Sequence, residues 1–475
     1  MGVTDEPTKS SEKLVAQTLE RSYDAMKKIN EYDQTEVDEL VQGIAWAICE
    51  DNRARELSEL AVKETGFGNV PDKINKKKRK TRGTLQEILG EPSVGVINRD
   101  EDLGLTEYAN PVGVVGAVVP STNPSATATN LTMMSIKGRN GIVLSPSPSA
   151  QKVVDRLVEY IHAELRKLGA PTDLVQMIPG AVSKDKTHAL MEQCDLLQVT
   201  GSANNVEYGQ RSGTPNYCVG EGNAVSIIDS SADLEQAAEN IMLSKTFDNA
   251  TSCSSDNSVV IVDDIYEEAL AQLEDAGGYL CETGERNRIE QALFPDGHGS
   301  LNGDLIARPV SELASAANIE LDDNKETSFL MIKARGVGPQ HPLSGEKLSL
   351  VLTVYRAEDI ESAIKMTTNI LDYEGAGHSC CLHTTIDEHI DRVGQSVPVC
   401  RVMINQPTCY GNGGNFNNGM PFTLSMGGGT WGGNQLDENL QYTHFINRTT
   451  VAEKIEPNEP DDDELFGSYF EKYGR

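Results

Sequence analysis

The spacing of apolar residues divides the chain into two parts. Through residues 11–92 apolar side chains recur every three or four positions, with Leu14, Leu19 and Tyr23 on one face of a first segment. This spacing predicts a mostly helical start. From about residue 111, short apolar runs alternate with helical segments. That alternation is typical of a parallel sheet covered by helices on both faces, so the sequence predicts an α/β fold.

The alternating region contains two series of strands. The first is predicted to have strands at 114–119, 141–144, 174–178 and 196–199, with helices at 125–137 and 150–168. The second begins after Gly222, with strands predicted at 224–228, 259–262, 348–355 and 401–404 and helices at 234–245, 266–273 and 359–367. A Gly/Asn-rich stretch at 408–434 and a terminal strand at 442–451 follow. We therefore expect two α/β domains and a long loop of the kind that is usually functional.

Composition narrows the classes of function. The chain carries 41 basic and 72 acidic residues, a net charge of −31, which argues against nucleic acid as a partner. It has no apolar run long enough to span a bilayer, and we expect no membrane association. The nine cysteines are an odd number without metal-ligand spacing, so we expect no metal site and a reduced, cytoplasmic protein. The acidic run at 456–464 is interpreted as a solvated tail.

One basic run stands out against this acidic background. Residues 76–80 read Lys-Lys-Lys-Arg-Lys, with Lys73 and Arg82 beside them. One interpretation is a solvated helix face. The alternative is a landing patch for a polyanionic ligand on an otherwise repellent protein. The sequence leaves both open.

Cys253 is the strongest candidate for chemistry. It lies between a predicted helix and a predicted strand, on a short loop of small and polar residues that a substrate could reach. A thiolate nucleophile needs such access and a surrounding that lowers its pKa. A small buried apolar cysteine is the alternative. Other loops at predicted strand ends, where parallel sheets bind ligands, are 120–124, 145–148, 200–202 and 220–223.

Six motifs, in order, carry a resemblance. They are Asn-Pro-Val-Gly-Val-Val-Gly at 110–116, Ser-Thr-Asn-Pro at 121–124, the loop around Cys253, Gly-Glu-Lys-Leu-Ser at 345–349, Gly-Ala-Gly-His-Ser at 375–379 and Gly-Thr-Trp-Gly-Gly-Asn at 429–434. Together they resemble the aldehyde dehydrogenase superfamily, and within it the coenzyme A-acylating branch. The resemblance extends from about residue 12 to 450.

The resemblance implies an aldehyde dehydrogenase-like fold, with two parallel-sheet α/β domains and a small β oligomerisation arm. Residues 1–222 would hold the N-terminal helices and the nicotinamide cofactor-binding domain, completed by about 410–440. Residues 223–409 would form the catalytic domain with the nucleophilic cysteine, and 440–475 the terminal strand and acidic tail. It also implies a homodimer or homotetramer.

The resemblance further implies a mechanism. Cys253 would attack the aldehyde carbonyl, and the Asn123 amide would stabilise the oxyanion, a contribution of roughly 3 kcal/mol for one such donor. Glu346 would hold the ribose hydroxyls of the nicotinamide cofactor; a solvated surface glutamate is the alternative. The remaining cofactor-binding residues would be Ser121, Thr122, Ser145, Pro146, Gly201, Ser202, Gly220 and Gly222.

The fate of the resulting thioester separates the branches of the superfamily. Val219 stands where hydrolytic members carry a glutamate base, so coenzyme A is the implied acyl acceptor. Glu221, two positions further on, could partly replace that base. Residues 145–149 read Ser-Pro-Ser-Pro-Ser and lack the His and Arg common in acylating relatives. Either NAD or NADP could serve, and the missing positive charge favours NAD.

The aldehyde itself is the least determined feature. The polar candidates for substrate contacts are Thr251, Ser252, His378, Arg401, Asn417 and Asn418. Polar residues suit an anionic tail, and the motifs resemble most the sulfoacetaldehyde-acylating group. Acetaldehyde and succinate semialdehyde are alternatives. A hydrolytic aldehyde dehydrogenase, and a non-catalytic component whose helix at 11–29 docks to an enzyme shell, are the other hypotheses.

Overall fold

Helices fill the N-terminal part of the structure, a computed structural model that describes residues 7–297, 299–322 and 324–475. They are α1 (Lys9–Ile29), α2 (Gln34–Cys49), α3 (Asp51–Thr65) and α4 (Val70–Ile88). Local signals set their ends, because Asp33 forms a capping box with Glu36 at the start of α2 and Gly66 ends α3 in the left-handed conformation. The predicted helical start is confirmed.

A first parallel sheet follows these helices. Within the described residues its strand order is β5 (Val175–Met177), β4 (Gly141–Pro146), β3 (Val114–Val119), β6 (Leu196–Thr200) and β7 (Asn216–Val219). Alternate residues of β3 enter two different cores, so the whole strand is buried. One face packs against α2, α5 (Pro124–Lys137) and α6 (Gln151–Lys167), and the other against α1, α7 (Lys184–Gln193) and α8 (Ala203–Arg211).

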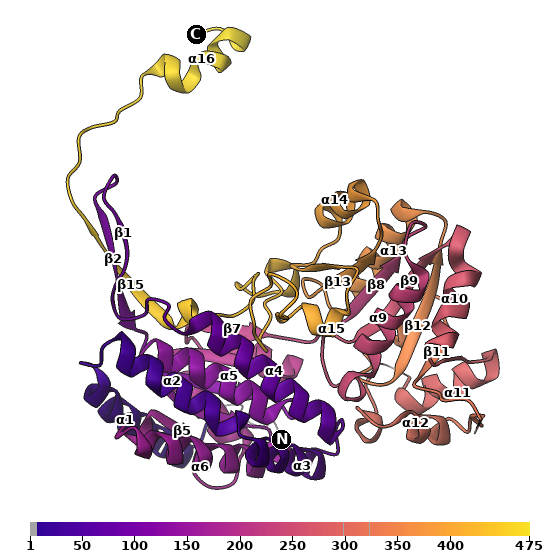
Figure 1. Cartoon of the computed structure of the whole chain (residues 1–475), viewed down its shortest axis with the longest axis horizontal. Coiled ribbons are helices and arrows are strands. Elements are labelled where there is room, and N and C mark those ends of the chain that lie inside the picture. Colours follow the sequence, from indigo (N-terminus) through magenta and orange to yellow (C-terminus); the bar gives the residue numbers. More distant parts are fainter. Residues whose placement is uncertain (1–6, 298, 323) are drawn as a thin grey trace.

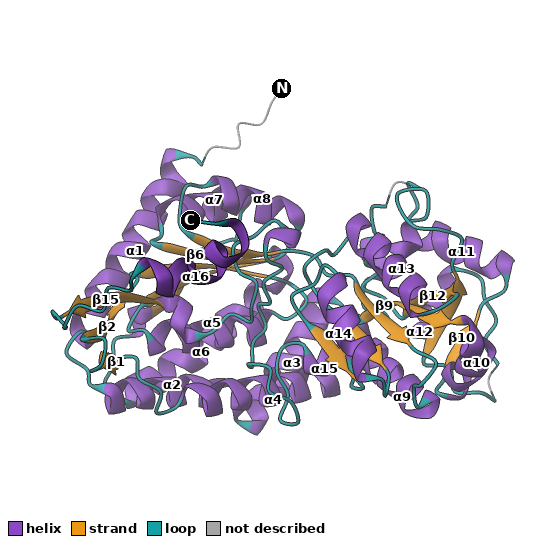
Figure 2. Cartoon of the chain, turned by 90° about the horizontal axis from the view of Figure 1, so that it is seen from above, coloured by secondary structure: helices purple, strands orange, loops and turns teal. Residues whose placement is uncertain are grey.

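A second, larger parallel sheet forms the other lobe (Figure 2). Its order in the described chain is β10 (Gly278–Leu280), β11 (Phe329–Lys333), β12 (Val351–Ala357), β9 (Asp256–Val262), β8 (Ala224–Ile228), β13 (Cys380–His383) and β14 (Val402–Ile404). One core contains α9 (Leu234–Thr246), α10 (Tyr266–Asp275), α11 (Thr283–Leu293) and α12 (Val310–Ala316), and the opposite core contains α13 (Ile360–Tyr373) and α14 (Asp387–Ser396). The prediction of two parallel sheets is confirmed.

A small antiparallel sheet projects from the first lobe (Figure 1). Strand β2 (Leu105–Pro111) lies between β1 (Gly95–Asp100) and the late strand β15 (Ile446–Ala452). The predicted terminal strand exists but starts later, because Tyr442–Phe445 forms a 3₁₀ turn first. The β1–β2 hairpin was not predicted, since its strands are mostly exposed and lack a clear apolar alternation. This sheet is the β arm that the resemblance implied.

The C-terminal tail is more ordered than the sequence suggested. Helix α16 (Asp462–Tyr473) begins inside the acidic run, with Asp461 as its N-cap. Acidic residues in the first turn stabilise a helix through its dipole, so the tail charge helps helix formation. Figure 1 shows α16 held away from both lobes. Among the described helices, no segment has the length and apolar character needed to cross a membrane.

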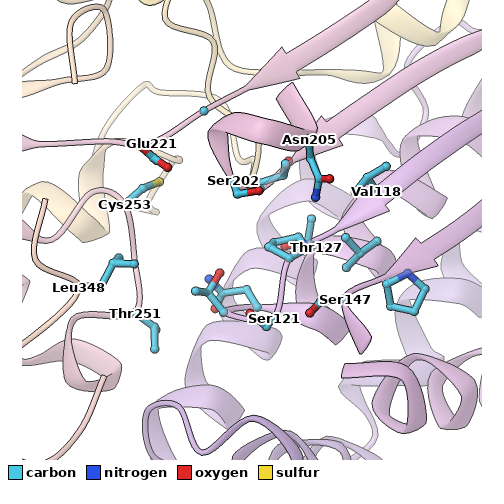
Figure 3. A pocket seen from close by; sticks show the side chains of 18 of the residues that line it. Val118, Ser121, Thr127, Ser147, Ser202, Asn205, Glu221, Thr251, Cys253 and Leu348 are labelled. Carbon is cyan, nitrogen blue, oxygen red and sulfur yellow. The ribbon is translucent and has the colours of Figure 1, made fainter. Parts of the chain in front are cut away.

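Residues 220–223 connect the two parallel sheets. The chain leaves the first sheet at Val219, the end of its edge strand β7, and enters the second at Ala224, the start of the inner strand β8. The loops that follow β3, β4 and β6 line the same cavity as Cys253, which lies on the loop before β9 (Figure 3). The short helix α15 (Thr408–Gly411) begins the predicted long loop, which is otherwise irregular through residue 429.

Candidate active site

A cavity of about 670 Å³ lies between the two lobes. Loops after β3, β4 and β6 line one side, and the loop before β9 lines the other (Figure 3). The cavity brings together most of the predicted site residues: Ser121, Thr122, Asn123, Ser145, Pro146, Gly201, Ser202, Gly220, Thr251, Ser252, Cys253 and Glu346. Its volume lies in the range of small-molecule and cofactor sites. Cys253 is partly exposed, as a nucleophile requires.

The loop before Cys253 has an unusual backbone. After α9 ends, Asp248, Asn249 and Ala250 have φ angles of 53°, 52° and 60°. Side chains disfavour this left-handed region, and alanine has no polar group to compensate. A run of such residues persists only where other contacts hold it, as is common at active sites.

Asp248 supplies those contacts. Its buried carboxylate accepts hydrogen bonds from Lys73 Nζ at 3.1 Å, Lys76 Nζ at 2.8 Å and the Thr251 hydroxyl at 2.7 Å. Burial by itself would raise the pKa of Asp248, but the charges of Lys76 and Lys73 outweigh it and lower the pKa to about 2. An ionised carboxylate and two lysines thus anchor the nucleophile loop to α4.

These contacts correct the interpretation of the basic run. Lys73, Lys76, Lys77 and Lys80 are all buried, because they share the inward face of α4. For these four residues the solvated helix face and the surface landing patch are both wrong. Only part of the run, such as Arg82, is exposed.

Lys76 also orients Asn123. The ammonium group donates to Asn123 Oδ1 at 2.7 Å and to Thr251 Oγ1 at 3.2 Å. An ammonium group only donates hydrogen bonds, so this contact determines which end of the carboxamide is oxygen. The NH₂ end of Asn123 remains available to the cavity. The amide is therefore set to donate to a developing oxyanion.

His378 lies against the nucleophile. Its Nε2 is 3.2 Å from Cys253 Sγ, and its Nδ1 is 2.8 Å from the Ser379 hydroxyl. Burial, with the nearby charge of Arg401, lowers the pKa of His378 to about 3. Burial and the charge of Glu346 raise the pKa of Cys253 to about 11. At neutral pH the pair is a thiol beside a neutral imidazole.

Gly222 is required for this contact. A Cβ at residue 222 would lie 2.4 Å from the Cys253 carbonyl oxygen and 2.9 Å from His378 Cδ2. Such distances exclude a side chain unless the backbone of the nucleophile loop moves. The same glycine N–H donates to Glu346 Oε1 at 3.4 Å. Gly222 therefore packs between the nucleophile and the predicted cofactor carboxylate.

Glu346 is buried at the edge of the cavity. Burial, with the charges of Glu374 and Glu221, raises its pKa well above the ordinary range. A buried carboxyl group of this kind needs hydrogen-bond partners. The hydroxyls of a bound ribose would supply them, so the residue fits its predicted role better than that of a surface glutamate.

The opposite wall fits the phosphates of a dinucleotide. Helices α5 and α8 begin at the cavity, and among the described residues their N-caps, Asn123 and Ser202, make no side-chain capping bond. Free N–H groups at helix N-termini favour anions, and in α8 the Ala203 N–H already donates to Glu221 Oε1 at 3.4 Å. The Ser145 hydroxyl is instead shared with Thr187 Oγ1 at 2.8 Å. The residues present therefore suit a nicotinamide dinucleotide.

Four predicted substrate residues lie outside the cavity lining, and of these His378 still contacts the nucleophile. Arg401 is buried behind Cys253 and donates to the Gly427 carbonyl oxygen. Asn418 donates to Gln406 Oε1 at 2.8 Å, and the Asn417 side chain accepts from Asn415. Their amides hold the irregular loop together, so the structure does not bring Asn417 and Asn418 to the nucleophile.

Comparisons with known proteins identify the family. The aldehyde dehydrogenase family matches residues 3–284. The chain belongs to the aldehyde dehydrogenase family. It is 44% identical to an acylating sulfoacetaldehyde dehydrogenase of Cupriavidus necator, over 99% of this chain and 95% of that protein. It is 39% identical to an acylating sulfoacetaldehyde dehydrogenase of Bilophila wadsworthia, over 98% and 100% of the two chains.

A solved structure confirms the predicted fold. This aldehyde dehydrogenase matches the crystal structure of an acetylating aldehyde dehydrogenase from Geobacillus thermoglucosidasius, with a TM-score of 0.90 and 31% identity. The match covers 95% of this chain and 99% of the other. The predicted resemblance to the coenzyme A-acylating branch, and the two-lobed α/β fold that it implied, are confirmed.

Val219, which the resemblance places where hydrolytic members carry their base, ends β7 and is buried. Glu221 lines the cavity and its Oε1 accepts from the Ala203 N–H, at the start of α8, at 3.4 Å. Figure 3 shows Glu221 on the same side of the cavity as Cys253.

Sequence reasoning missed the residues of this aldehyde dehydrogenase that support the nucleophile. Lys76 and Asp248 had no assigned role, although a signal existed. Lys73, Lys76, Lys77 and Lys80 recur at helical spacing, so they form one stripe on α4. A cationic stripe requires an acidic partner if it is buried, and Asp248 stands five residues before the candidate cysteine.

Proposed function

We propose that this aldehyde dehydrogenase oxidises sulfoacetaldehyde to sulfoacetyl-CoA, with NAD as the favoured electron acceptor, NADP as the alternative and coenzyme A as the acyl acceptor. Two relatives that carry the name acylating sulfoacetaldehyde dehydrogenase, at 44% and 39% identity over nearly the whole chain, support this substrate. Acetaldehyde and succinate semialdehyde remain the alternative substrates.

One observation carries the reaction class. Cys253 lies at the cavity with the His378 imidazole 3.2 Å from its sulfur. The resemblance places Val219, at the end of β7, where hydrolytic members carry their base. An alkyl side chain cannot remove a proton from water. A thioester on Cys253 would therefore survive until a stronger nucleophile arrives, and a thiol is one.

The first step uses the His378 imidazole as a base. Because Nδ1 lies beside the Ser379 hydroxyl, the tautomer that carries its proton on Nδ1 leaves Nε2 free to accept the thiol proton. The low pKa of His378 and the high pKa of Cys253 keep both groups neutral at rest. Proton transfer therefore accompanies the attack of sulfur on the aldehyde carbon.

The next steps use the opposite side of the cavity. The carbonyl oxygen gains negative charge as the C–S bond forms, and the Asn123 NH₂ group, oriented by Lys76, donates to it. The chemistry that a bound nicotinamide would supply is removal of a hydride from the same carbon. Collapse of the oxyanion leaves a thioester on Cys253. Ser121, Thr122, Ser145, Pro146, Gly201, Ser202, Gly220, Gly222 and Glu346 would hold the cofactor.

The second half of the reaction regenerates the Cys253 thiol. His378 first loses to solvent the proton that it took from Cys253. The acyl group then leaves Cys253 for the thiol of coenzyme A, whose proton His378 accepts and passes to the departing cysteine sulfur. Arg401 supports this thiolate, because its buried charge lowers the pKa of Cys253 against the effect of burial. The balanced products are the acyl-CoA, the reduced cofactor, one proton released to solvent and the original Cys253 thiol.

The test is steady-state formation of NADH from sulfoacetaldehyde with and without coenzyme A. We expect activity to require coenzyme A, mass spectrometry to find sulfoacetyl-CoA, and Cys253→Ala to abolish both. A free-acid product at an undiminished rate without coenzyme A would instead favour the hydrolytic alternative, with Glu221 as the base. Glu221→Gln would then abolish turnover.

We further infer a homodimer or homotetramer in the cytoplasm. Strand β15 forms an open edge of the small sheet and is mostly exposed. Unpaired strand edges favour pairing with another chain. All nine cysteines are free, as expected in a reducing compartment. Light scattering tests the oligomer, and substitution of Thr449 in β15 by proline should yield monomers.

A further inference from the structure

A second pocket, of only about 20 Å³, adjoins the main cavity beside the nucleophile. Asn123, Ser252 and Met426 line both spaces, so a group bound in the second pocket would lie close to a substrate held at Cys253. The second pocket is also lined by Ser254 and by residues of α4. Ser252 and Ser254 flank Cys253 in the chain, and consecutive Cα atoms are about 3.8 Å apart. Only a short chain is needed between a carbonyl at Cys253 and this pocket.

Three cationic side chains of α4 line the second pocket, and two of them already have partners. Lys76 is occupied by Asp248, Asn123 and Thr251. Lys80 donates to the backbone carbonyl oxygens of Gly413 and Gly414.

Arg79 is the third cation and lacks a partner. Within the described residues its Nε and Nη1 are buried without any hydrogen bond, and it forms no salt bridge there. Its guanidinium lies 4.1 Å from the ring centroid of Tyr410 and 5.6 Å from that of Phe247. The rings hold the charge in place but accept no ordinary hydrogen bond. Buried donors without acceptors are unfavourable, so the group is set to receive an anion.

Hydroxyl groups beside Arg79 can also turn toward such an anion. Ser254 Oγ lies 3.8 Å from the sulfur of Met426 and also interacts with the Cys253 thiol, and sulfur is a weak acceptor in both contacts. Ser252 Oγ accepts the Ser254 N–H at 3.3 Å, so its own hydroxyl proton is not used in that bond. The pocket thus offers a fixed charge and two adjustable donors.

We propose that Arg79, together with Ser252 and Ser254, binds the sulfonate of the aldehyde substrate and so determines its selection over uncharged aldehydes. This assignment rests on the proposed function. It places the head group next to α4 rather than at Arg401, whose side chain lies outside the pockets that hold Cys253 and Arg79. An uncharged aldehyde such as acetaldehyde would leave the donors of Arg79 unmatched.

Because the protein as a whole is acidic, binding of a sulfonate requires a cation at the site itself. A net charge of −31 repels a sulfonate at long range. Selection must therefore come from contacts at close range, in a site sheltered from solvent, where a charge-assisted hydrogen bond is strongest.

The experiment compares Arg79→Met with Arg82→Met in the full chain. Methionine keeps the apolar packing against Tyr410 and Phe247 while removing the donors. Arg82 is exposed on the same helix, so its substitution removes the same charge without touching the pocket. The measured quantity is the ratio of kcat/KM for sulfoacetaldehyde to kcat/KM for acetaldehyde, both with coenzyme A.

We expect Arg79→Met to lower this ratio roughly 100-fold, which is about 2.7 kcal/mol at 1.36 kcal/mol per decade. Arg82→Met should leave it unchanged. An unchanged ratio in Arg79→Met would overturn the assignment, as would equal losses with both aldehydes. If Arg79→Met does not fold, as judged by circular dichroism, Arg79→Lys must still lower the ratio, because an ammonium group lacks the Nε–H donor.

Failure of the proposed function would look different. Wild-type protein that reduces NAD with acetaldehyde and coenzyme A but not with sulfoacetaldehyde would refute the proposed substrate, and the assignment of Arg79 with it. Wild-type protein that turns over sulfoacetaldehyde, with no dependence on Arg79, would refute the assignment alone.

Discussion

Substitution of Lys76 by methionine tests how the structure prepares the oxyanion site. Lys76 makes three hydrogen bonds, to Asn123 Oδ1 at 2.7 Å, to Asp248 Oδ2 at 2.8 Å and to Thr251 Oγ1 at 3.2 Å. Methionine has a similar length and makes none of them. The Asn123 amide is then free to rotate, and Asp248 loses one of its two cationic partners.

The two losses have different magnitudes and different readouts. An oxyanion donor is worth roughly 3 kcal/mol, so loss of its orientation should lower kcat by about 10- to 100-fold. Asp248 keeps Lys73 at 3.1 Å and the Asn69 N–H at 3.0 Å. The remaining partners limit the stability loss to about 1.5–3 kcal/mol, the value of one charged hydrogen bond.

The assay is coenzyme A-dependent NADH formation, with unfolding in urea measured in parallel. Lys77→Met is the matched control, because Lys77 is equally buried on the same helix but its Nζ donates to Ser58 Oγ at 2.9 Å, away from the nucleophile loop. We expect it to retain the wild-type kcat. A double mutant with Asn123→Ala separates positioning from general damage, since Lys76→Met should cost little once the amide is absent.

Two outcomes would refute this reasoning. A Lys76→Met enzyme with wild-type kcat would mean that Asn123 needs no orientation. Equal fold-losses from Lys76→Met in the presence and absence of the Asn123 amide would mean that Lys76 acts on kcat by another route, such as the backbone of the nucleophile loop.

Three further predictions concern the nucleophile and its surroundings. Because the pKa of Cys253 is raised to about 11, the rate at which iodoacetamide alkylates this residue without cofactor should rise about tenfold per pH unit from neutral pH to about pH 10. A rate that reaches a plateau below pH 9 would contradict the raised pKa. Gly222→Ala should lower kcat more than tenfold, because the added Cβ would lie 2.4 Å from the Cys253 carbonyl oxygen. Gly394→Ala is the control and should keep the wild-type kcat, because the space around its Cβ is open. Equal kcat values for the two variants would refute the packing argument. The pKa of Asp248 is lowered from 3.8 to about 2, so its contribution is complete above pH 4 and is lost as the pH falls through the folded value. The free energy of unfolding of the wild type relative to Asp248→Asn, from urea titrations, should therefore shrink by about 2 kcal/mol between pH 4 and pH 2, and a constant difference would show that Asp248 is not ionised.

The sequence by itself determined where the main helices and strands lie and that Cys253 is the candidate nucleophile. The buried strands β3 and β8 fall at their predicted residues, and α9 ends just before the cysteine loop, because period and capping are local properties of the chain. The cysteine loop was recognisable for the same reason, since its small and polar residues are adjacent in sequence. The order of the six motifs along the chain also indicated the family.

The β1–β2 hairpin and the role of the long loop could not be predicted in this way. Strand β2 is held between β1 and β15, a strand more than three hundred residues later, and β1 carries little apolar alternation of its own. The polar composition of the loop suggested substrate contacts for Asn417 and Asn418. Their amides instead bond to neighbouring loop residues, a use that composition does not reveal.

Only the tertiary structure decided the surroundings of Cys253. A lysine stripe on a helix has the same pattern whether it faces water or an aspartate, and the partner Asp248 is 172 residues from Lys76 along the chain. His378 is likewise 125 residues from the sulfur it contacts. Hydrophobic periodicity reports the environment of one segment, whereas burial of charge depends on which distant segments meet. The buried charges that prepare the nucleophile are therefore a property of the fold.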